Sequence, residues 1–302
     1  ANRAAQNVYE SQDDLFDWAK VDDSIFKAGL LTAWSEALLY TADVPEQTIL
    51  DKLDEVLKLL PVGQLTKASF SQETEDDTWL KLQILGKAYN NRGYLHRSSG
   101  RYGEAYDDYL SALRFFGQIG LEDERANTLT NLAYLMALLG RVDTAKHHIE
   151  EAIRIREKWD KSKRYTIALS RNTDGLIDTY GGRPELGIRK FRTALAICEE
   201  VEEPRGIGMA YNALGFALRR RGEQWKLDPL YYEPEEPTSY FIEAEETLQK
   251  AIKIFTESVN EPIRLWEAYN ELGSLFCDWA FLTYQNKADW PVAIKQYEKS
   301  IK

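Results

Sequence analysis

The chain has 302 residues, of which 44% are hydrophobic and 29% are charged, a balance typical of a soluble folded protein and not of a disordered one. Its formal net charge of −11 argues against a general binder of nucleic-acid backbones, which needs clustered Lys and Arg in excess. There is no signal peptide and no apolar run near the roughly 18 residues of a membrane span. Cys198 and Cys277 match no metal or redox spacing, so we expect a cytoplasmic protein in which they are small hydrophobic residues.

The N-terminal segment, residues 1–73, is expected to contain one helical hairpin. Apolar residues recur at helical spacing over residues 24–42 and again over 46–60, and residues 61–73 are expected to form a loop. This hairpin lacks the repeated pattern that comes after it. We interpret it as a degenerate repeat or a cap, followed by a repeat array over residues 74–302.

Within that array, five segments align with one another. Each has a small residue early in its first helix, where a larger side chain would keep the second helix at a distance. These residues are Gly93, Ala133, Gly175, Gly215 and Gly273, spaced by 40, 42, 40 and 58 residues. The second helix of each segment carries a small residue and, four positions later, a bulky one, so that both lie on one packed stripe. The bulky residues are Tyr109, Ile149, Phe191, Leu248 and Tyr297.

Four glycines stand where the first helices should end. They are Gly100, Gly140, Gly182 and Gly222. The left-handed backbone conformation that ends many helices costs a residue with a Cβ atom roughly 1–2 kcal/mol. Glycine has no Cβ atom and avoids that cost. We therefore predict a left-handed cap at each of the four.

These repeated residues resemble the tetratricopeptide repeat (TPR) family over about residues 86–302. The spacing near 40 exceeds the usual value of about 34, so the resemblance is to the long-repeat type of kinesin light chains, bacterial peptide-sensing regulators and sensor arms of signalling ATPases. It implies an all-α fold, a right-handed α-solenoid of antiparallel helical hairpins. It also implies a scaffold that binds a protein or peptide and is not an enzyme.

In this family the first helices line a concave groove, so the resemblance places particular positions of those helices in a binding site. One position is Asn in four segments: Asn90, Asn172, Asn212 and Asn270. The second segment has Thr130 there, with Asn131 beside it. Because a primary amide has both a donor and an acceptor, a row of them could hold an extended peptide backbone. The alternative, that these amides bond neighbouring helices or water, remains open.

Other groove positions would supply specificity. They carry Lys87, Tyr94, Arg97, Asn127, Tyr134, Leu176, Tyr180, Met209, Phe216, Arg219, Arg220, Glu267 and Asp278. An acidic peptide, or one bound by its C-terminal carboxylate, would suit Arg97, Arg219 and Arg220. Alternatively, Arg219, Arg220 and Arg221 compensate the dipole at a helix C-terminus. Lys87 lacks the partner residues of the carboxylate clamp found in chaperone-binding relatives, so that clamp is not predicted.

Two insertions separate the helices of the last two segments, at residues 223–240 and 281–290. The first contains three prolines and four aromatic residues, so it cannot be helical throughout. We expect its aromatic side chains to fold back over the array, with contact to a partner as the alternative.

The sequence contains no motif of a known catalytic class: GxxxxGK[ST], HExxH, GxSxG and CxxC are all absent. His147 and His148 are adjacent on a helix and point about 100° apart, so we expect a solvated face there. No catalytic residue, metal or cofactor is predicted, and neither nucleic acid nor membrane is an expected partner.

The last helix stops at Lys302, barely past its packing residues. Because an uncapped repeat leaves an apolar face bare, we expect either a fragment of a longer chain or self-association through this end. The sequence leaves two functions open: an adaptor that captures a peptide or protein segment, and the ligand-sensing arm of a larger bacterial signalling protein.

Overall fold

The computed structural model describes residues 24–39, 44–61, 75–159, 164–224, 235–259, 261–282 and 291. Every regular element in these ranges is a helix, as expected. The chain divides into two compact units, Ala1–Leu135 and Met136–Lys302, and the boundary falls inside helix α6 (Glu122–Leu138). This boundary differs from the one at residue 74, which rests on the sequence repeat and stays a prediction.

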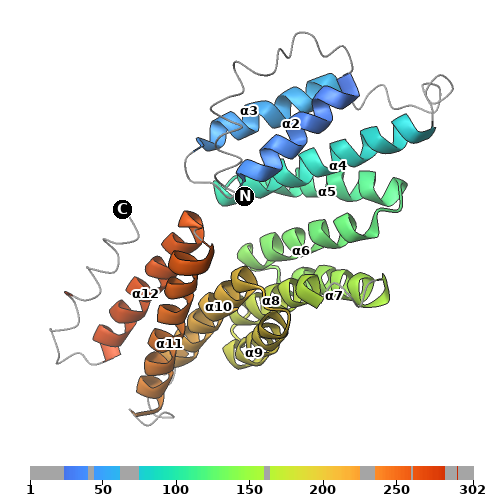
Figure 1. Cartoon of the computed structure of the whole chain (residues 1–302). Helices are drawn as coiled ribbons and strands as arrows, with labels where there is room; N and C mark the ends of the chain where they lie inside the picture. Colours follow the sequence, from blue (N-terminus) through green and yellow to red (C-terminus); the bar gives the residue numbers. More distant parts are fainter. Residues whose placement is uncertain are drawn as a thin grey trace. The chain divides into compact units, whose positions relative to one another are not determined.

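The first unit begins with the expected N-terminal hairpin, formed by α2 (Ser24–Leu38) and α3 (Glu46–Leu59). The hairpin packs on α4 (Glu75–Ser98), which in turn pairs with α5 (Tyr102–Gln118), as Figure 1 shows. The apolar stripe of α3 is buried because Leu53 and Val56 meet Leu85 and Phe115 in one core cluster. The hairpin is therefore part of the packed unit and not a separate body.

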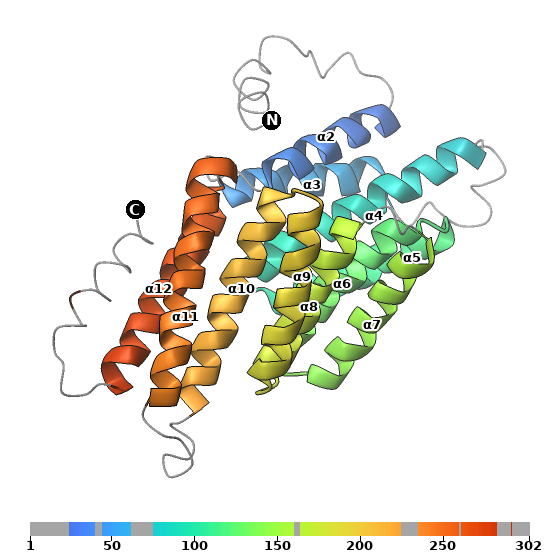
Figure 2. The ribbon, with the colours of Figure 1, turned by 60° about the horizontal axis from the view of Figure 1, so that its bottom comes forward.

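The second unit is a run of helices in which each packs on the next. It contains α7 (Val142–Trp159), α8 (Arg164–Tyr180), α9 (Pro184–Glu200), α10 (Pro204–Glu223), α11 (Glu235–Ile254), the π-helical turn η5 (Phe255–Val259) and α12 (Pro262–Leu282). Figure 2 shows α10, α11 and α12 side by side. Pro184 and Pro204 begin their helices, where the missing N–H has no intrahelical partner to lose. The unit thus has the chain-order packing expected of helical hairpins.

Close approach at small residues, predicted from the repeat, is confirmed in three hairpins. A Cβ atom added to Gly93 would lie 2.9 Å from the Tyr109 ring. At Gly175 it would lie 2.7 Å from the Phe191 ring, and at Gly215 it would lie 2.6 Å from the Leu248 side chain. In each hairpin the bulky residue expected on the second helix fills the space that the glycine leaves open.

Three of the four predicted glycine caps are confirmed, and the fourth is wrong. Gly100, Gly140 and Gly182 have φ angles of 74°, 71° and 77°, in the left-handed region that favours glycine. Gly222 instead lies within α10, which continues to Glu223. A Cβ atom there would lie 2.4 Å from the Phe241 ring of α11, so this glycine makes room for a helix contact.

The two predicted insertions lie mostly outside the described residues. Of the first, residues 225–234 are not described, and α11 already begins at Glu235. Tyr240, at its end, packs against the core of the second unit, with the Arg221 guanidinium 5.1 Å from its ring centroid. Residues 283–290 and the second helix of the fifth segment, with Tyr297, also lie outside the described residues.

Candidate functional site

Two of the predicted groove stripes meet in the first unit, one on α4 and one on α6. On α4, Asn90, Tyr94 and Arg97 follow the spacing i, i+4, i+7 that keeps side chains on one face of a helix. On α6, residues 127, 131 and 134 follow the same spacing. We call the following set the α4–α6 face: Lys87, Asn90, Tyr94, Arg97, Asn127, Asn131 and Tyr134.

Three contacts join the stripes. At one end of the face, the Lys87 Nζ atom of α4 lies 3.6 Å from the Glu124 carboxylate of α6. In the middle, the Asn131 side-chain amide donates a hydrogen bond of 3.1 Å to the Asn90 amide oxygen. Toward the helix ends, the Arg97 guanidinium lies 4.6 Å from the Tyr134 ring centroid. The predicted site residues of α4 therefore contact α6 at three places along the two helices.

The Asn90–Asn131 pair still has hydrogen-bonding capacity. After their mutual bond, the Asn90 amide nitrogen and the Asn131 amide oxygen make no other hydrogen bond within the described chain. Both residues are half-buried. One donor and one acceptor side by side complement the C=O and N–H of a peptide backbone.

The partner of Asn90 is Asn131 and not the aligned Thr130. The Thr130 hydroxyl donates to the Ala126 carbonyl of its own helix, at 2.8 Å. In the second segment the aligned residue, Thr130, thus bonds its own helix, and the neighbouring residue, Asn131, bonds Asn90. The i, i+4, i+7 spacing through Asn127, Asn131 and Tyr134 is the sequence signal for this shift.

Arg97 lies between two aromatic rings, with its guanidinium 5.0 Å from the Tyr94 ring centroid and 4.6 Å from that of Tyr134. Its Nε atom is buried without a hydrogen-bond partner. Burial by itself lowers the pKa of Arg97, but Tyr109, Tyr134 and Tyr94 outweigh it, so that the pKa is raised overall. The residue is therefore a fixed positive charge held by cation–π contacts.

Arg97 has no carboxylate or carbonyl oxygen as a partner, unlike the other arginines that are shielded from solvent in the described chain. Arg156, for example, donates to the Thr166 carbonyl oxygen at 3.0 Å. A carboxylate holds each of the remaining ones, which are Arg92, Arg101, Arg125, Arg171, Arg205, Arg219, Arg221 and Arg264. Since a guanidinium has five N–H donors, Arg97 keeps the capacity to bind an anion.

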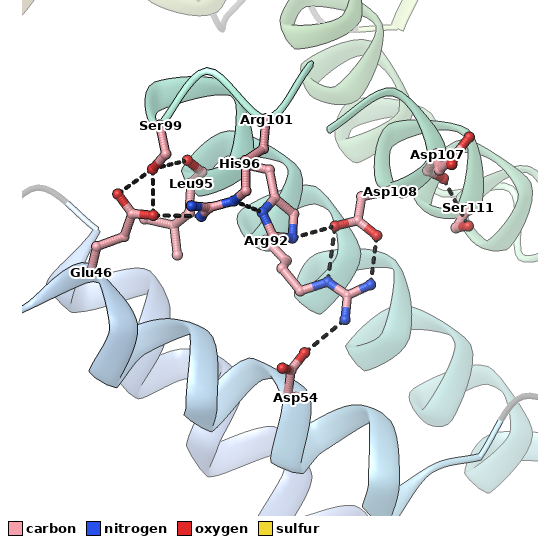
Figure 3. A network of polar contacts seen from close by, with 10 residues as sticks. All are labelled: Glu46, Asp54, Arg92, Leu95, His96, Ser99, Arg101, Asp107, Asp108 and Ser111. Carbon is pink, nitrogen blue, oxygen red and sulfur yellow. Dashed lines mark hydrogen bonds and ion pairs between the residues drawn. The ribbon is translucent and has the colours of Figure 1, made fainter. Parts of the chain in front are cut away.

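A separate polar network occupies the other side of α4 (Figure 3). Arg92 bonds both oxygens of Asp108, at 2.9 and 2.7 Å, and reaches Asp54 of α3 at 2.7 Å. Arg101 donates to Glu46 of α3 at 2.6 Å and to the His96 Nδ1 atom at 2.7 Å. These bonds tie α3 to the α4–α5 hairpin, so we assign the network a structural role.

The His96 imidazole in this network should make stability depend on pH. Burial lowers its pKa; Asp108 opposes this, and Arg101 and Arg92 add to it. The unfolded chain, with a His pKa of about 6.5, therefore binds more protons than the folded chain. Neutral His96 therefore stabilises the fold fully above about pH 6.5, the pKa of the unfolded chain, and this stabilisation is lost as the pH falls below that value.

We accordingly expect the urea midpoint of unfolding to fall between about pH 7.5 and about pH 5, and to fall less in a His96→Asn variant. Asn keeps an acceptor for Arg101 but does not titrate. His148, whose pKa burial also lowers, is present in both proteins and cancels in the comparison. Parallel pH profiles of the two proteins would contradict this assignment.

The predicted site residues of the second unit are placed differently. Tyr180 and Phe216, from α8 and α10, form an aromatic pair with ring centroids 5.3 Å apart, and Leu176 is partly buried beside the core. The side-chain oxygens of Asn172 and Asn212 are buried without a hydrogen-bond donor. Asn270 is half-buried on α12. The described contacts join none of the three asparagines in a pair like Asn90–Asn131.

The two predicted groove arginines of the second unit, Arg219 and Arg220, already have acidic partners in the chain. The Arg219 guanidinium bonds Glu271, lies 2.6 Å from Asp278 and lies 3.2 Å from Glu223. Arg220 is exposed and bonds Glu223 at 2.6 Å. A ligand carboxylate would have to compete with these acids, so the α4–α6 face is the stronger candidate for anion binding.

The described residues contain no group of three or more His, Cys, Asp or Glu arranged to hold a metal ion. Burial raises the pKa of the Cys198 thiol to about 11, and the side chain packs with Ala168 and Ala194 as the small hydrophobic residue expected. No helix in the described part of the chain is long and apolar enough to cross a membrane.

Comparison with protein families identifies the repeat. The sequence profile of the tetratricopeptide repeat matches residues 85–158, which include the whole α4–α6 face. Residues 85–158 are tetratricopeptide repeats. A search of curated protein sequences returned no match.

Solved structures with similar folds include two Rap proteins. A Rap protein complexed with competence and sporulation factor superposes with a TM-score of 0.66 at 17% identity, over 99% of this chain and 71% of that one. The apo form of RapI gives 0.56 at 17% identity, over 98% and 91%. At such identities the likeness establishes the all-α TPR solenoid fold and no more.

A third similar structure is a signal transduction ATPase with numerous domains (STAND) from Pyrococcus horikoshii, which has a tetratricopeptide repeat sensor. It superposes with a TM-score of 0.55 at 14% identity, over 99% of this chain. The chain spans 41% of the length of that protein.

Proposed function

We propose that this chain is a non-catalytic scaffold that binds a protein or peptide segment in extended conformation along the α4–α6 face. The observation that carries the proposal is the Asn90–Asn131 pair, which leaves one donor and one acceptor beside each other. An extended segment presents the same two groups on each residue. A scaffold that bonds them gains affinity without reading side chains.

The flanking residues support this assignment. Tyr94 and Tyr134 place aromatic surface next to the amide pair, and Arg97 adds a positive charge within a chain of net charge −11. An acidic or C-terminal segment is therefore the preferred ligand. A Rap protein of similar fold was solved in complex with competence and sporulation factor, which supports a binding role for this chain.

The test is a selection of random displayed peptides against the parent chain and an Asn90→Ala/Asn131→Ala variant. We expect selected peptides to bind the variant about tenfold more weakly, because two hydrogen bonds of roughly 0.5–1.5 kcal/mol each are lost. The dissociation constants would be measured by fluorescence anisotropy.

Two further variants serve as controls. Ser111→Ala removes a hydroxyl on α5 that bonds its own helix, so it should bind like the parent. An Asn172→Ala/Asn212→Ala/Asn270→Ala variant tests the asparagines of the second unit by themselves, and it should bind the selected peptides like the parent. Equal affinity of the parent and the Asn90→Ala/Asn131→Ala variant would rule out the amide pair as the binding site.

A second proposal is that the chain is the ligand-sensing arm of a larger signalling protein. It is supported by the likeness to the STAND protein with a tetratricopeptide repeat sensor. The two proposals share the peptide site and differ in the consequence of binding. A sensor needs an effector domain, such as a nucleotide-binding one, whose activity changes with the ligand; an adaptor needs none.

A further inference from the structure

The α4–α6 face combines two features that are independent of each other, a polar amide pair and an arginine without an acidic partner. Asn90 and Arg97 are seven residues apart on α4, which corresponds to about 10 Å along the helix axis. An extended peptide covers that distance in about three residues. A peptide lying along the helix would therefore reach Arg97 about three residues after the Asn pair.

The chemistry at Arg97 favours a singly charged, planar anion. One guanidinium is available, because Lys87 on the same face lies between Glu36, at 3.4 Å, and Glu124, at 3.6 Å. A dianionic phosphate would meet a single uncompensated positive charge in an acidic chain. A carboxylate matches that charge and accepts the two parallel N–H bonds of a guanidinium.

The Tyr94 and Tyr134 rings hold the guanidinium from both stripes, so little side-chain freedom is left to lose on binding. The other shielded arginines in the described parts of the chain are already bonded to oxygens of the protein, and they would have to exchange those partners for a ligand. Arg97 would not.

Resting on the proposed function, we propose that Arg97 binds a carboxylate of the bound peptide, about three residues from the peptide unit held by Asn90 and Asn131. The carboxylate is either the C-terminus of the peptide or an Asp or Glu side chain. In the first case the peptide ends at Arg97, and its N-to-C direction runs from the Asn pair toward that residue.

Peptides selected on the parent chain test this. Each is synthesised with a free C-terminus, with a C-terminal amide, and with its acidic side chains changed to amides. We expect one of the two neutralisations to weaken binding to the parent about 10- to 100-fold, as for a charge-assisted bond. The same neutralisation should change binding to Arg97→Gln by less than about twofold. Which neutralisation matters identifies the source of the carboxylate.

The matched control is Arg114→Gln. Arg114 is an exposed arginine on α5 with a cation–π contact to Phe115 at 5.2 Å, so the peptides should bind this variant like the parent. Thermal unfolding of Arg97→Gln confirms that the variant is folded before binding is measured. An equal loss on neutralisation in the parent and in Arg97→Gln would overturn the proposal while leaving the peptide site in place.

A second measurement does not depend on any peptide. The Arg97 Nε–H resonance, assigned by its absence in Arg97→Gln, is followed while sodium acetate replaces sodium chloride at constant ionic strength. A saturable shift at Arg97, with none at the carboxylate-bonded Arg92, supports the carboxylate site even where no peptide is enriched. If no peptide is enriched, an Arg97 resonance that does not shift overturns the carboxylate site. A stronger response to inorganic phosphate than to acetate also overturns it. Where peptides do bind, the neutralisation experiment decides.

Discussion

Replacing Arg92 with methionine is expected to lower the free energy of unfolding by about 3–5 kcal/mol. Asp108 is only 4% exposed, and both of its carboxylate oxygens are bonded by Arg92. Methionine keeps much of the length of the side chain but donates no hydrogen bond, so the variant contains a buried carboxylate that has lost its main partner. The measurement is urea unfolding followed by far-UV circular dichroism, compared with the parent.

Two variants isolate the cause. Asp54→Asn removes the other ion pair of Arg92, but the Asp54 side chain is 47% exposed, so we expect a loss below about 1 kcal/mol. Arg92→Met combined with Asp108→Leu removes both charges and should recover much of the loss, because no buried carboxylate is left uncompensated. If Arg92→Met costs no more than Asp54→Asn, the network is not a determinant of stability.

The hairpin packing could be predicted from the sequence because it depends on local regularities. The helical period brings Gly175 and the ring of Phe191 to matching heights, and the recurrence of a glycine matched with a bulky residue indicates close helix contact. Gly222 shows the limit of such a prediction. A glycine near a helix end is equally compatible with a left-handed cap and with a tight helix contact. Only Phe241, on the next helix, decides between the two.

The candidate site was predictable in its residue types and not in its charge balance. Arg97 and Arg219 occupy equivalent positions of their first helices and look alike in the sequence. Two of the three acids that neutralise Arg219 come from α12, 52 and 59 residues further along the chain. For Arg97, the neighbouring first helix supplies Tyr134 instead. Long-range partners of this kind have no fixed spacing, so only the fold distinguishes the compensated arginine from the available one.

The close packing of α8 on α9 can also be tested at Gly187, on the second helix of this hairpin. A Cβ atom there would lie 2.2 Å from the Thr179 Oγ1 atom and 2.8 Å from the Gly175 carbonyl oxygen. Thr179 is itself fixed, because its hydroxyl donates to that same carbonyl oxygen at 2.9 Å. Because the obstacle includes backbone, Gly187→Ala should force α8 and α9 apart and cost about 1–3 kcal/mol, despite the better helix propensity of alanine.

Gly103→Ala on α5 is the matched control for Gly187→Ala. Nothing lies within 4 Å of a Cβ atom at Gly103, so only the helix propensity acts there, and the substitution should be neutral or stabilise by up to about 1 kcal/mol. In urea unfolding, the free energy of unfolding should therefore fall in Gly187→Ala and stay the same or rise in Gly103→Ala. A similar gain in both would mean that α8 and α9 do not need the close approach that the repeated small residues provide.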